Sequence, residues 1–261
     1  MTTGTESPAS APVESQVVVI TGASGGIGAA LAELLSRQGH FLVLVARRED
    51  ALLEVAERCG PHAHAIVADV TRRIEVKRVV AESIARFGAV HVLVNNVGQG
   101  ISRMPSVLTG EDIDDTMRVN VKSALYGMQE ILPHFKARGS GQIVNVSSML
   151  GRVPMATIRS AYVGAKHFLN ALTATFRAEI QETHPNIQVS LVSPGVVRTD
   201  FGLNALHGGP DSRALPDSQS AEEVAAVIAD VIATRAPDMY TARGAKARVA
   251  GYYAGIGADP A

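Results

Sequence analysis

The most constraining feature of this sequence is a glycine-rich turn between a short apolar run and an amphipathic segment. Residues 16–21, QVVVIT, are rich in β-branched side chains and too short for a helix, whereas alanine and leucine recur at helical spacing over residues 26–38. The turn itself, residues 21–28, reads TGASGGIG. Glycines at a strand-to-helix turn let backbone N–H groups approach a pyrophosphate, and the amino end of the helix favours its negative charge. The segment therefore favours a dinucleotide-binding α/β fold.

The spacing of these glycines leaves a second interpretation open. Gly-x-x-x-Gly-x-Gly differs from the general G-x-G-x-x-G fingerprint of dinucleotide sites. A tight turn between strand and helix also favours glycine for purely structural reasons. The position of the turn, directly after a β-branched run and before an amphipathic helix, favours binding.

Apolar runs recur along the chain with helical stretches between them, the pattern of a parallel sheet covered on both faces. Strands are expected at residues 16–21, 41–45, 64–68, 90–95, 142–147, 187–193 and 239–241. Helices are expected at residues 26–38, 49–58, 74–87, 110–137, 161–183 and 222–234, with Pro133 as the point where the long fourth helix would kink. We therefore predict one doubly wound, three-layer αβα domain of the Rossmann type, with about seven strands and its ligand at their carboxyl ends.

Residues 16–261 are assigned to this domain, residues 1–15 to a flexible tail, and residues 196–219 to a mobile loop over the substrate. Composition limits the partners. A net charge of −1 gives no electrostatic reason to bind nucleic acid or an anionic membrane, and no apolar stretch reaches the ~18 residues of a membrane span. Cys59 is the single cysteine, which fits a reducing compartment and a cytoplasmic location. His62 and His64 have no third ligand nearby, so no metal is expected.

The residues after the second predicted strand bear on the type of cofactor. An acidic residue there would bind the ribose 2′-hydroxyl of NAD, but the sequence continues Ala46-Arg47-Arg48 with no carboxylate until Glu49. Arginine offers a planar fork suited to the 2′-phosphate of NADP, although solvated arginines in a first helical turn would look the same. NADP(H) is therefore favoured and NAD(H) is the alternative. Asp69, after the third strand, suits equally a hydrogen bond from adenine and a cap on the next helix.

The candidate chemistry lies further along the chain. Tyr162 and Lys166 are four residues apart and share one helix face. A neighbouring ammonium lowers the pKa of a tyrosine from its usual value of about 10, although a plain surface pair would have the same spacing. Upstream, the strand at residues 142–147 ends with Ser147, and Ser148 follows it. Strand alternation sends the two serine hydroxyls to opposite sides, so only one of them is expected to bond to a substrate carbonyl.

Together these motifs resemble the short-chain dehydrogenase/reductase family in its single-domain form. The resemblance runs from Gln16 to about Thr241. It rests on an ordered set of motifs: TGASGGIG at residues 21–28, Asp69-Val70, Asn95-Asn96-Val97-Gly98, Asn120, Ser148, Tyr162 with Lys166, and Pro194-Gly195. The valine at position 97, where alanine is usual, and the absence of a basic residue at Gly25 depart from the family pattern, as does a Ser148–Tyr162 spacing one residue longer than usual.

The resemblance implies a role for each catalytic residue. Tyr162 would be the general acid in carbonyl reduction and the base in alcohol oxidation. Lys166 would lower the pKa of that tyrosine and hold the nicotinamide ribose, and Ser148, chosen over Ser147 for its place in Ser-Ser-x-x-Gly, would polarise the carbonyl. Asn120 would support a water that links Lys166 to solvent. Asn95 would stabilise the centre of the sheet near the cofactor.

The same resemblance implies two larger sets of residues. The cofactor-binding set is Gly22, Ser24, Gly25, Gly26, Ile27, Gly28, Arg47, Arg48, Asp69, Val70, Asn96, Val97, Gly98, Tyr162, Lys166, Pro194, Gly195, Val197 and Thr199, in which Arg47 would mark NADP preference. The substrate-pocket set is Ser148, Met149, Leu150, Met155, Tyr162, Val196, Phe201 and Leu203. Most of these pocket residues are apolar, which suits a bulky hydrophobic substrate.

We therefore expect an NADP(H)-dependent oxidoreductase that acts on a ketone or secondary alcohol. An NAD-dependent alcohol dehydrogenase and a 3-oxoacyl-thioester reductase are the alternatives, and a non-catalytic dinucleotide-binding or scaffold protein is the alternative from another class. The complete Asn120, Ser148, Tyr162 and Lys166 set argues against the last of these. The family pairs the helices expected at residues 110–137 and 161–183 between subunits, which implies a homodimer or homotetramer.

Overall fold

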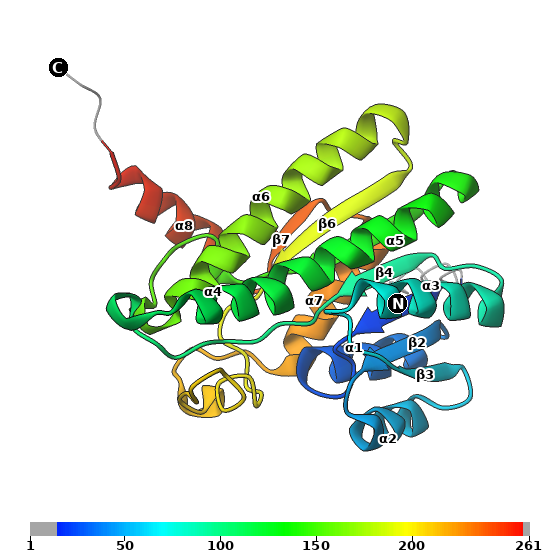
Figure 1. Ribbon diagram of the computed structural model, residues 1–261. Coiled ribbons are helices and arrows are strands. Elements are labelled where there is room, and N and C mark those ends of the chain that lie inside the picture. The colour runs from blue at the N-terminus through cyan, green and yellow to red at the C-terminus, as the bar shows by residue number, and fades with distance from the viewer. Residues whose placement is uncertain (1–14, 258–261) are drawn as a thin grey trace, which may run out of the picture.

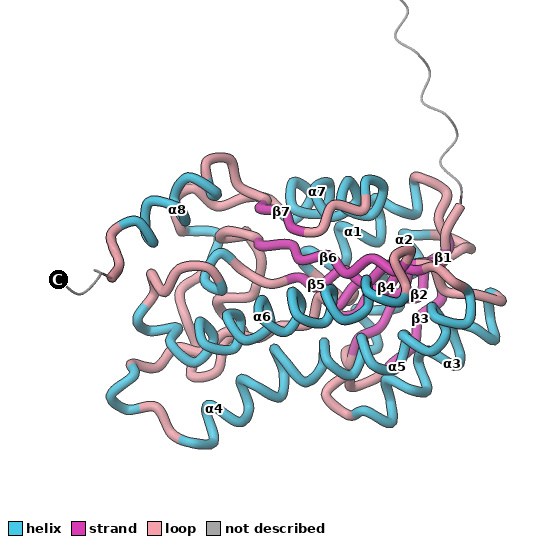
Figure 2. Tube along the Cα trace, turned by 90° about the horizontal axis from the view of Figure 1, so that it is seen from above, coloured by secondary structure: helices cyan, strands magenta, loops and turns pink. Residues whose placement is uncertain are grey.

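Alternating apolar side chains along the strands create a sheet with a helical layer on each side (Figures 1 and 2). The computed structural model describes residues 15–257. Its seven strands lie in the order β3-β2-β1-β4-β5-β6-β7, and all six pairings are parallel. The strands are β1 (Val17–Thr21), β2 (Phe41–Ala46), β3 (Ala63–Val67), β4 (Val92–Asn95), β5 (Gly141–Val146), β6 (Ile187–Ser193) and β7 (Asp238–Tyr240). The predicted doubly wound Rossmann fold is confirmed.

Each face of the sheet has its own core. One face packs against α1 (Gly26–Arg37), α2 (Glu49–Cys59) and α7 (Ala221–Thr234). The other packs against α3 (Arg73–Phe87), α5 (Ser123–Arg138) and α6 (Ser160–Thr183) (Figure 2). Within β1, Val18 and Ile20 join the first core whereas Val17 and Val19 join the second. This alternation fixes the register of the strands, because a shift of one residue would exchange the two faces.

The observed boundaries differ from the predicted ones mostly by one or two residues, as expected where helix ends fray. One helix was not predicted. The C-terminal α8 (Ala245–Ala254) packs through Ala245, Val249 and Tyr252, while most of its other residues are exposed. So few buried positions leave a weak periodic pattern in the sequence. The predicted tail falls almost wholly on residues 1–14, which lie outside the described residues.

The predicted helix at residues 110–137 is not one continuous α-helix, and this part of the prediction was wrong. It consists of α4 (Gly110–Met117), a π-helical turn at Arg118–Lys122, and α5. Pro133 lies inside α5, which continues through it to Arg138. The interruption therefore falls at the π-helical turn, which inserts one extra residue into the helical ladder.

The loops that follow β4, β5 and β6 meet at the carboxyl ends of the strands, on the left side of Figure 1. A short parallel bridge pairs Ile101, after β4, with Leu206, after β6. Another bridge, between Val197 and Gln219, closes the base of the loop after β6. This is the edge at which a doubly wound sheet binds its ligand. Within residues 15–257, no helix is both long and apolar enough to cross a membrane.

Candidate active site

The glycine turn has backbone conformations that require glycine. Gly22 and Gly26 have φ values of +69° and +54°, in the left-handed region that side chains rarely adopt. A Cβ at Gly28 would lie 2.3 Å from the carbonyl oxygen of Gly22, so α1 can begin this close to β1 only without a side chain there. Gly25, the residue that precedes α1, provides no side-chain cap. The N–H groups of the first turn are thus left for another acceptor, which is what a bound pyrophosphate provides.

Asn96 holds this turn against the end of β4. Its Nδ2 donates to the carbonyls of Thr21 (3.1 Å) and Gly22 (3.3 Å), and its backbone N–H donates to the Thr21 hydroxyl (3.0 Å). The Val97 side chain lies 3.3 Å from the position a Gly22 Cβ would occupy. Asn96 therefore holds the glycine turn in place by bonding to the backbone carbonyls of the turn. Asn95 points elsewhere, since its Nδ2 donates to Asn145 Oδ1 (2.9 Å) at the centre of the sheet.

Of the two arginines after β2, Arg48 is the one in contact with the turn. Its Nη2 donates to the carbonyl and to the hydroxyl of Ser24, both at 3.2 Å, and lies 3.2 Å from where a Gly25 Cβ would be. Arg47 is exposed, and within the described residues it makes no hydrogen bond or ion pair. The sequence assigned the cofactor signal mainly to Arg47. Here Arg48 sits at the turn, and Arg47 points into solvent beside it.

Asp69 closes a turn in front of α3. Its Oδ1 accepts hydrogen bonds from the backbone N–H (3.0 Å) and hydroxyl (2.8 Å) of Thr71. The residue that precedes α3 is Arg72, so Asp69 does not cap the helix, and that alternative was wrong. It forms an Asx turn instead, which fixes the loop after β3. Val70, next to it, is buried.

The π-helical turn places Asn120 in the site. Asn120 Nδ2 donates to the carbonyls of Thr116 (3.0 Å) and Gln99 (2.9 Å), and its Oδ1 accepts from the Gln99 N–H (3.0 Å). The side chain thus supplies a partner to the Thr116 carbonyl at the point where the π turn changes the helical ladder. It also clamps the loop after β4. Because residue 98 is glycine, Asn120 Oδ1 and Lys166 Nζ can approach it, 3.2 and 3.6 Å from where its Cβ would lie.

The two serines after β5 point in different directions. The Ser147 hydroxyl donates to Asn170 Oδ1 on α6. The Ser148 hydroxyl accepts a hydrogen bond from the Leu150 N–H (3.1 Å) and lies close enough to Tyr162 to act on the pKa of its hydroxyl. Strand alternation thus separates the two hydroxyls in the predicted way, and Ser148 is the one beside the tyrosine.

Burial dominates the electrostatics of Tyr162. It raises the pKa of the Tyr162 hydroxyl to about 12, while the Ser148 hydrogen bond and the charge of Arg159 act in the opposite direction. The sequence predicts a lowered pKa from Lys166, and the net direction in the structure is the opposite one. The reason is desolvation: the phenolate loses more from leaving water than its neighbours restore. Tyr162 is therefore protonated at neutral pH in this structure.

Lys166 lies beneath the tyrosine, one helical turn further along α6. Its Nζ donates to the carbonyl of Val146 (3.0 Å) and lies 5.7 Å from the centroid of the Tyr162 ring. Burial lowers the pKa of the Lys166 ammonium to about 7. The end of β5 and the start of α6 thus bring a hydroxyl pair and an amine together, in a part of the molecule from which water is largely excluded.

A family comparison agrees with this geometry. Residues 16–207 match the family model for short chain dehydrogenases. The chain belongs to the short-chain dehydrogenase family. It is an oxidoreductase of the kind that interconverts alcohols and carbonyl compounds.

Relatives of this short-chain dehydrogenase support the assignment. An uncharacterized oxidoreductase of Staphylococcus epidermidis is 35% identical over 198 residues, which cover 74% of this chain and 85% of the relative. A short-chain dehydrogenase/reductase from Burkholderia phymatum, solved with NAD, matches in fold with a TM-score of 0.85 at 24% identity, over 96% of this chain and 99% of that one. An alcohol dehydrogenase from Thermococcus sibiricus, solved with 5-hydroxy-NADP, has a TM-score of 0.75 at 27% identity, over 87% and 95% of the two chains.

The loop after β6 covers the edge of this short-chain dehydrogenase where Tyr162 lies. The Phe201 ring packs edge-on against the Tyr162 ring, with 5.5 Å between centroids. Thr199 lies 3.2 Å from where a Gly26 Cβ would be, so the same loop also touches the glycine turn. The Pro194 carbonyl accepts a hydrogen bond from the Met149 N–H (2.7 Å), which joins the ends of β5 and β6. The predicted cofactor and substrate sets thus adjoin one another along this loop.

The predicted pocket residues do not all lie together. Met149 is buried in a small cluster with Val153 and Ala245, under α8 and away from an open pocket. Met155, Val196 and Leu203 are 52%, 39% and 48% exposed, so they do not form a closed wall. Phe201 is the pocket residue that contacts the tyrosine directly. The sequence showed their apolar character but not which side of each loop would face the site.

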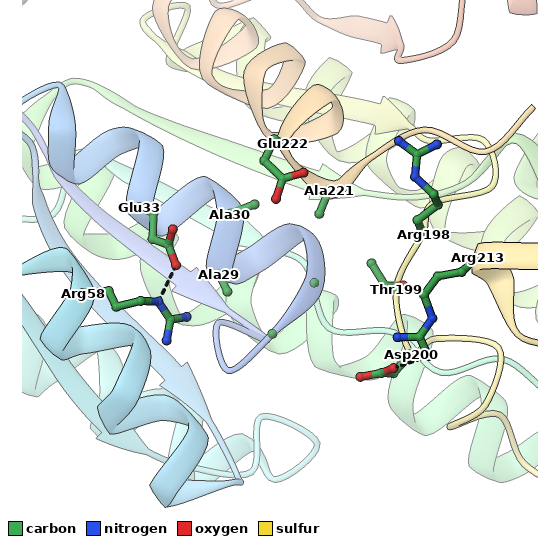
Figure 3. Close-up of a pocket in the computed structure, with 12 residues that line it drawn as sticks. Ala29, Ala30, Glu33, Arg58, Arg198, Thr199, Asp200, Arg213, Ala221 and Glu222 are labelled. Carbon is green, nitrogen blue, oxygen red and sulfur yellow. Dashed lines mark hydrogen bonds and ion pairs between the residues drawn. The ribbon is translucent and has the colours of Figure 1, made fainter.

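A cleft of about 340 Å³ opens beside the glycine turn, between α1, the start of α7 and the loop after β6 (Figure 3). It borders the predicted residues Gly25, Gly26 and Thr199. It also brings in charged residues that sequence reasoning did not select: Glu33, Arg58, Arg198, Asp200, Arg213 and Glu222. Several are paired, such as Arg58 with Glu33 (2.7 Å) and Arg213 with Asp200 (2.9 Å). Within residues 15–257, no cluster of three His, Cys, Asp or Glu side chains could hold a metal.

Proposed function

We propose that this protein is an NADP(H)-dependent oxidoreductase that transfers a hydride between the nicotinamide and a ketone or secondary alcohol. The observation that carries the proposal is the neighbouring pair of buried hydroxyls, Ser148 and Tyr162, next to the buried amine of Lys166. A bound nicotinamide would supply the hydride in reduction and accept it in oxidation. The chain itself has to bind the cofactor, orient the carbonyl and manage one proton.

In this proposal, Tyr162 donates and accepts the proton. In reduction, its Oη gives a proton to the oxygen of the substrate carbonyl as negative charge develops there, while the Ser148 hydroxyl donates a hydrogen bond to the same oxygen. A tyrosine with a pKa of about 12 is fully protonated at neutral pH and so is ready to act as an acid. Oxidation requires the reverse transfer, and a charged Lys166 would then stabilise the phenolate. Asn120 fixes the loop after β4 against this group and, through Gly98, adjoins Lys166.

The residues around the glycine turn fit a dinucleotide. The uncapped start of α1 suits the pyrophosphate, and the position of Arg48 at the turn suits a phosphate on the adenosine ribose better than a free hydroxyl. The end of β2 is Ala46, so no carboxylate is placed there to bind a ribose 2′-hydroxyl. The solved relatives carry NAD in one case and 5-hydroxy-NADP in another, and so do not separate the two. NADP(H) is our choice and NAD(H) the alternative.

The substrate side suits a bulky apolar ketone or alcohol. Phe201 packs on Tyr162, and the loops on this side carry exposed apolar side chains at Met155, Val196 and Leu203. A 3-oxoacyl thioester is the alternative substrate, since its carbonyl would meet the same hydroxyl pair. A role as a non-catalytic dinucleotide-binding protein would give no reason for the buried Ser148–Tyr162–Lys166 arrangement, which lowers stability by desolvating an amine. A cytoplasmic location remains a prediction from the sequence.

We further propose a homodimer or homotetramer. A cavity of about 620 Å³ lies on the surface formed by α3, α5 and α6. Its apolar lining is Leu125, Leu132, Leu172 and Phe176, and Arg73, Lys136 and Glu179 surround these side chains. An apolar face with a charged rim is suited to a second copy of the chain. Light scattering at micromolar concentration should show an oligomer, and a monomer would remove this part of the proposal.

The test of the function separates binding from chemistry. Tyr162→Phe removes only the hydroxyl, so carbonyl reduction should fall by about a hundredfold to ten-thousandfold, the usual contribution of a general acid. NADPH binding, measured by the quenching or shift of its fluorescence, should stay nearly unchanged. Tyr253→Phe is the matched control, because it removes an exposed tyrosine hydroxyl that donates to the Arg152 carbonyl and should affect activity far less. Full activity in Tyr162→Phe would refute the mechanism.

A further inference from the structure

Arg159 differs from the other arginines around the substrate side. It ends the short 3₁₀ turn Thr157–Arg159 that leads into α6. Its side chain makes one hydrogen bond within the described residues, from Nη1 to the carbonyl of Ile101 (3.1 Å), and it has no acidic partner there. The neighbouring arginines are each paired with an acid: Arg103 with Asp112, Arg152 with Asp238 and Arg198 with Glu223. The charge of Arg159 is therefore uncompensated.

Two glycines from different loops make room for this guanidinium. A Cβ at Gly100, after β4, would lie 2.8 Å from Arg159 Nη1. A Cβ at Gly209, in the loop after β6, would lie 2.9 Å from Nη2. The two loops thus close around Arg159, and burial lowers the pKa of its guanidinium, which still remains charged at any physiological pH. Arg159 is half-buried, and even partial burial of an unpaired charge costs free energy, so its retention calls for a reason.

The charge acts on Tyr162, three residues further along. The positive charge of Arg159 lowers the pKa of the tyrosine, and the tyrosine in turn raises that of the arginine. The same loop covers both groups. Phe201 packs on the Tyr162 ring, and its edge lies 3.1 Å from the Gly100 Cβ position beside the guanidinium. The loop after β6 therefore covers Tyr162 and part of Arg159 together.

The other charged groups near the tyrosine act differently. Lys166, on the same helix, has a pKa lowered to about 7 by burial, so it is only partly charged near neutral pH in this structure. Beyond Ile101, Arg103 and His207 both contact Asp112, at 2.8 and 2.7 Å. Two uncharged residues also lie against Tyr162. Ser148, after β5, lies near its hydroxyl, and Phe201, in the loop after β6, packs on its ring. Arg159 is thus the permanent cation next to Tyr162.

We propose that Arg159 is a positioning residue that stabilises, from the substrate side, the negative charge that forms on Tyr162 Oη. This inference rests on the proposed role of Tyr162 as the acid and base. A charge shielded from water acts more strongly on its neighbour than an exposed one does. Closing the loop after β6 over Arg159 therefore couples enclosure of the substrate to ionisation of the tyrosine.

The test measures Tyr162 ionisation without turnover. Each protein is saturated with NADP⁺ and titrated while the ultraviolet absorbance of phenolate is followed, and its Tyr162→Phe version is subtracted to remove the other tyrosines. Arg159→Gln should raise the apparent pKa of Tyr162 by about one unit, and Arg159→Lys, which keeps the charge, should restore most of it. Arg103→Gln is the matched control, since it removes a loop arginine already paired with Asp112, and it should leave this pKa unchanged. The rising limb of the pH profile for alcohol oxidation should move by the same amount as the titration.

Two results would overturn the inference: no rise in Arg159→Gln, or an equal rise in Arg103→Gln, which would mean that loop packing and not charge is responsible. If Arg159→Gln fails to fold, Arg159→Met serves instead, because it keeps an unbranched apolar side chain and removes the charge. This variant should also raise the apparent pKa of Tyr162, and the absence of a rise would count against the proposal. Failure of the proposed function is recognised separately, by full activity of Tyr162→Phe in the otherwise unchanged protein.

Discussion

The cofactor side and the substrate side of this site are built in different ways. Around the glycine turn, the buried contacts come from the ends of adjacent strands and from one short side chain, Asn96, which reaches two carbonyls, and Arg48 bonds to Ser24 at the exposed edge. Around the substrate, the loops are joined by long side chains, such as Arg159 to Ile101 and His207 to Asp112. The sheet fixes the first region, whereas the second depends on a few ionic and polar contacts between loops. The cofactor half is thus the more rigid, and the substrate half is the one that can open.

Gly28→Ala should have the largest effect on stability and on NADPH binding, because it lies in the rigid cofactor half. Its Cβ would lie 2.3 Å from the Gly22 carbonyl oxygen and 2.8 Å from Asn96 Nδ2, and the Gly22 backbone leaves it no room to move. We expect a loss of about 1–3 kcal/mol in the free energy of unfolding, measured by urea denaturation, and no detectable NADPH binding.

Gly251→Ala is the control for that change. Gly251 lies in α8 with no atom within 4 Å of its Cβ position, so alanine should leave stability unchanged or raise it by roughly 0.5–1 kcal/mol. If Gly28→Ala bound NADPH normally, the close approach of α1 to β1 would not be what forms the cradle.

Asp112→Asn should have a smaller effect, confined to the substrate half. Asp112 accepts hydrogen bonds from Arg103 (2.8 Å) and Thr109 (3.0 Å) and contacts His207, which ties α4 to the loop after β6. Loss of the charge should loosen this loop, raise KM several-fold and leave NADPH binding intact. Asp115→Asn, which breaks the exposed pair with Arg118, is the control and should change little. An equal loss of cofactor binding in Asp112→Asn would contradict the division into two halves.

The pH dependence of this contact follows from the same geometry. His207 and the Thr109 backbone hold the pKa of the Asp112 carboxyl well below its ordinary value of 3.8. A depressed pKa in the folded state means that the contribution to stability is complete above the ordinary pKa and is lost as the pH falls below it. The loop should therefore stay closed across the neutral range and loosen only in strong acid. Hydrogen exchange of residues 199–219 at decreasing pH would show this.

The sequence predicted the cofactor half better than the substrate half, for a physical reason. Strand periodicity and positive-φ glycines are local, so the turn at residues 21–28 and the alternation of Ser147 and Ser148 could be anticipated. The break at Asn120 could not, because a π-helical turn depends on a side chain that bonds to Gln99 in another loop. Nor could the sequence show that Arg48, and not Arg47, contacts the turn, or that Met149 packs under α8. The direction of a side chain in a loop is set by tertiary contacts. The unpaired charge of Arg159 could not be predicted either, because ion pairs of the neighbouring arginines join residues far apart in the sequence.

The smallest predicted effect concerns the choice between the two cofactors. Arg48→Ala should weaken NADPH binding by about tenfold more than NADH binding, because it removes a charge-assisted contact to the 2′-phosphate. Arg47→Ala should show the same preference more weakly, since Arg47 is exposed and does not contact the turn. Parallel fluorescence titrations with both cofactors would measure this. Equal losses for NADPH and NADH in Arg48→Ala would make the arginine a structural support for Ser24.

The most direct test of the account is the rate of NADPH oxidation with a panel of ketones, run in parallel with NADH and with Tyr162→Phe. We predict consumption of NADPH that depends on the ketone, is strongest with bulky apolar ketones, is slower with NADH, and is absent in Tyr162→Phe although that variant still binds NADPH. Binding of NADPH without ketone-dependent consumption by the unmodified protein, or equal rates in Tyr162→Phe, would contradict a tyrosine-dependent hydride transfer.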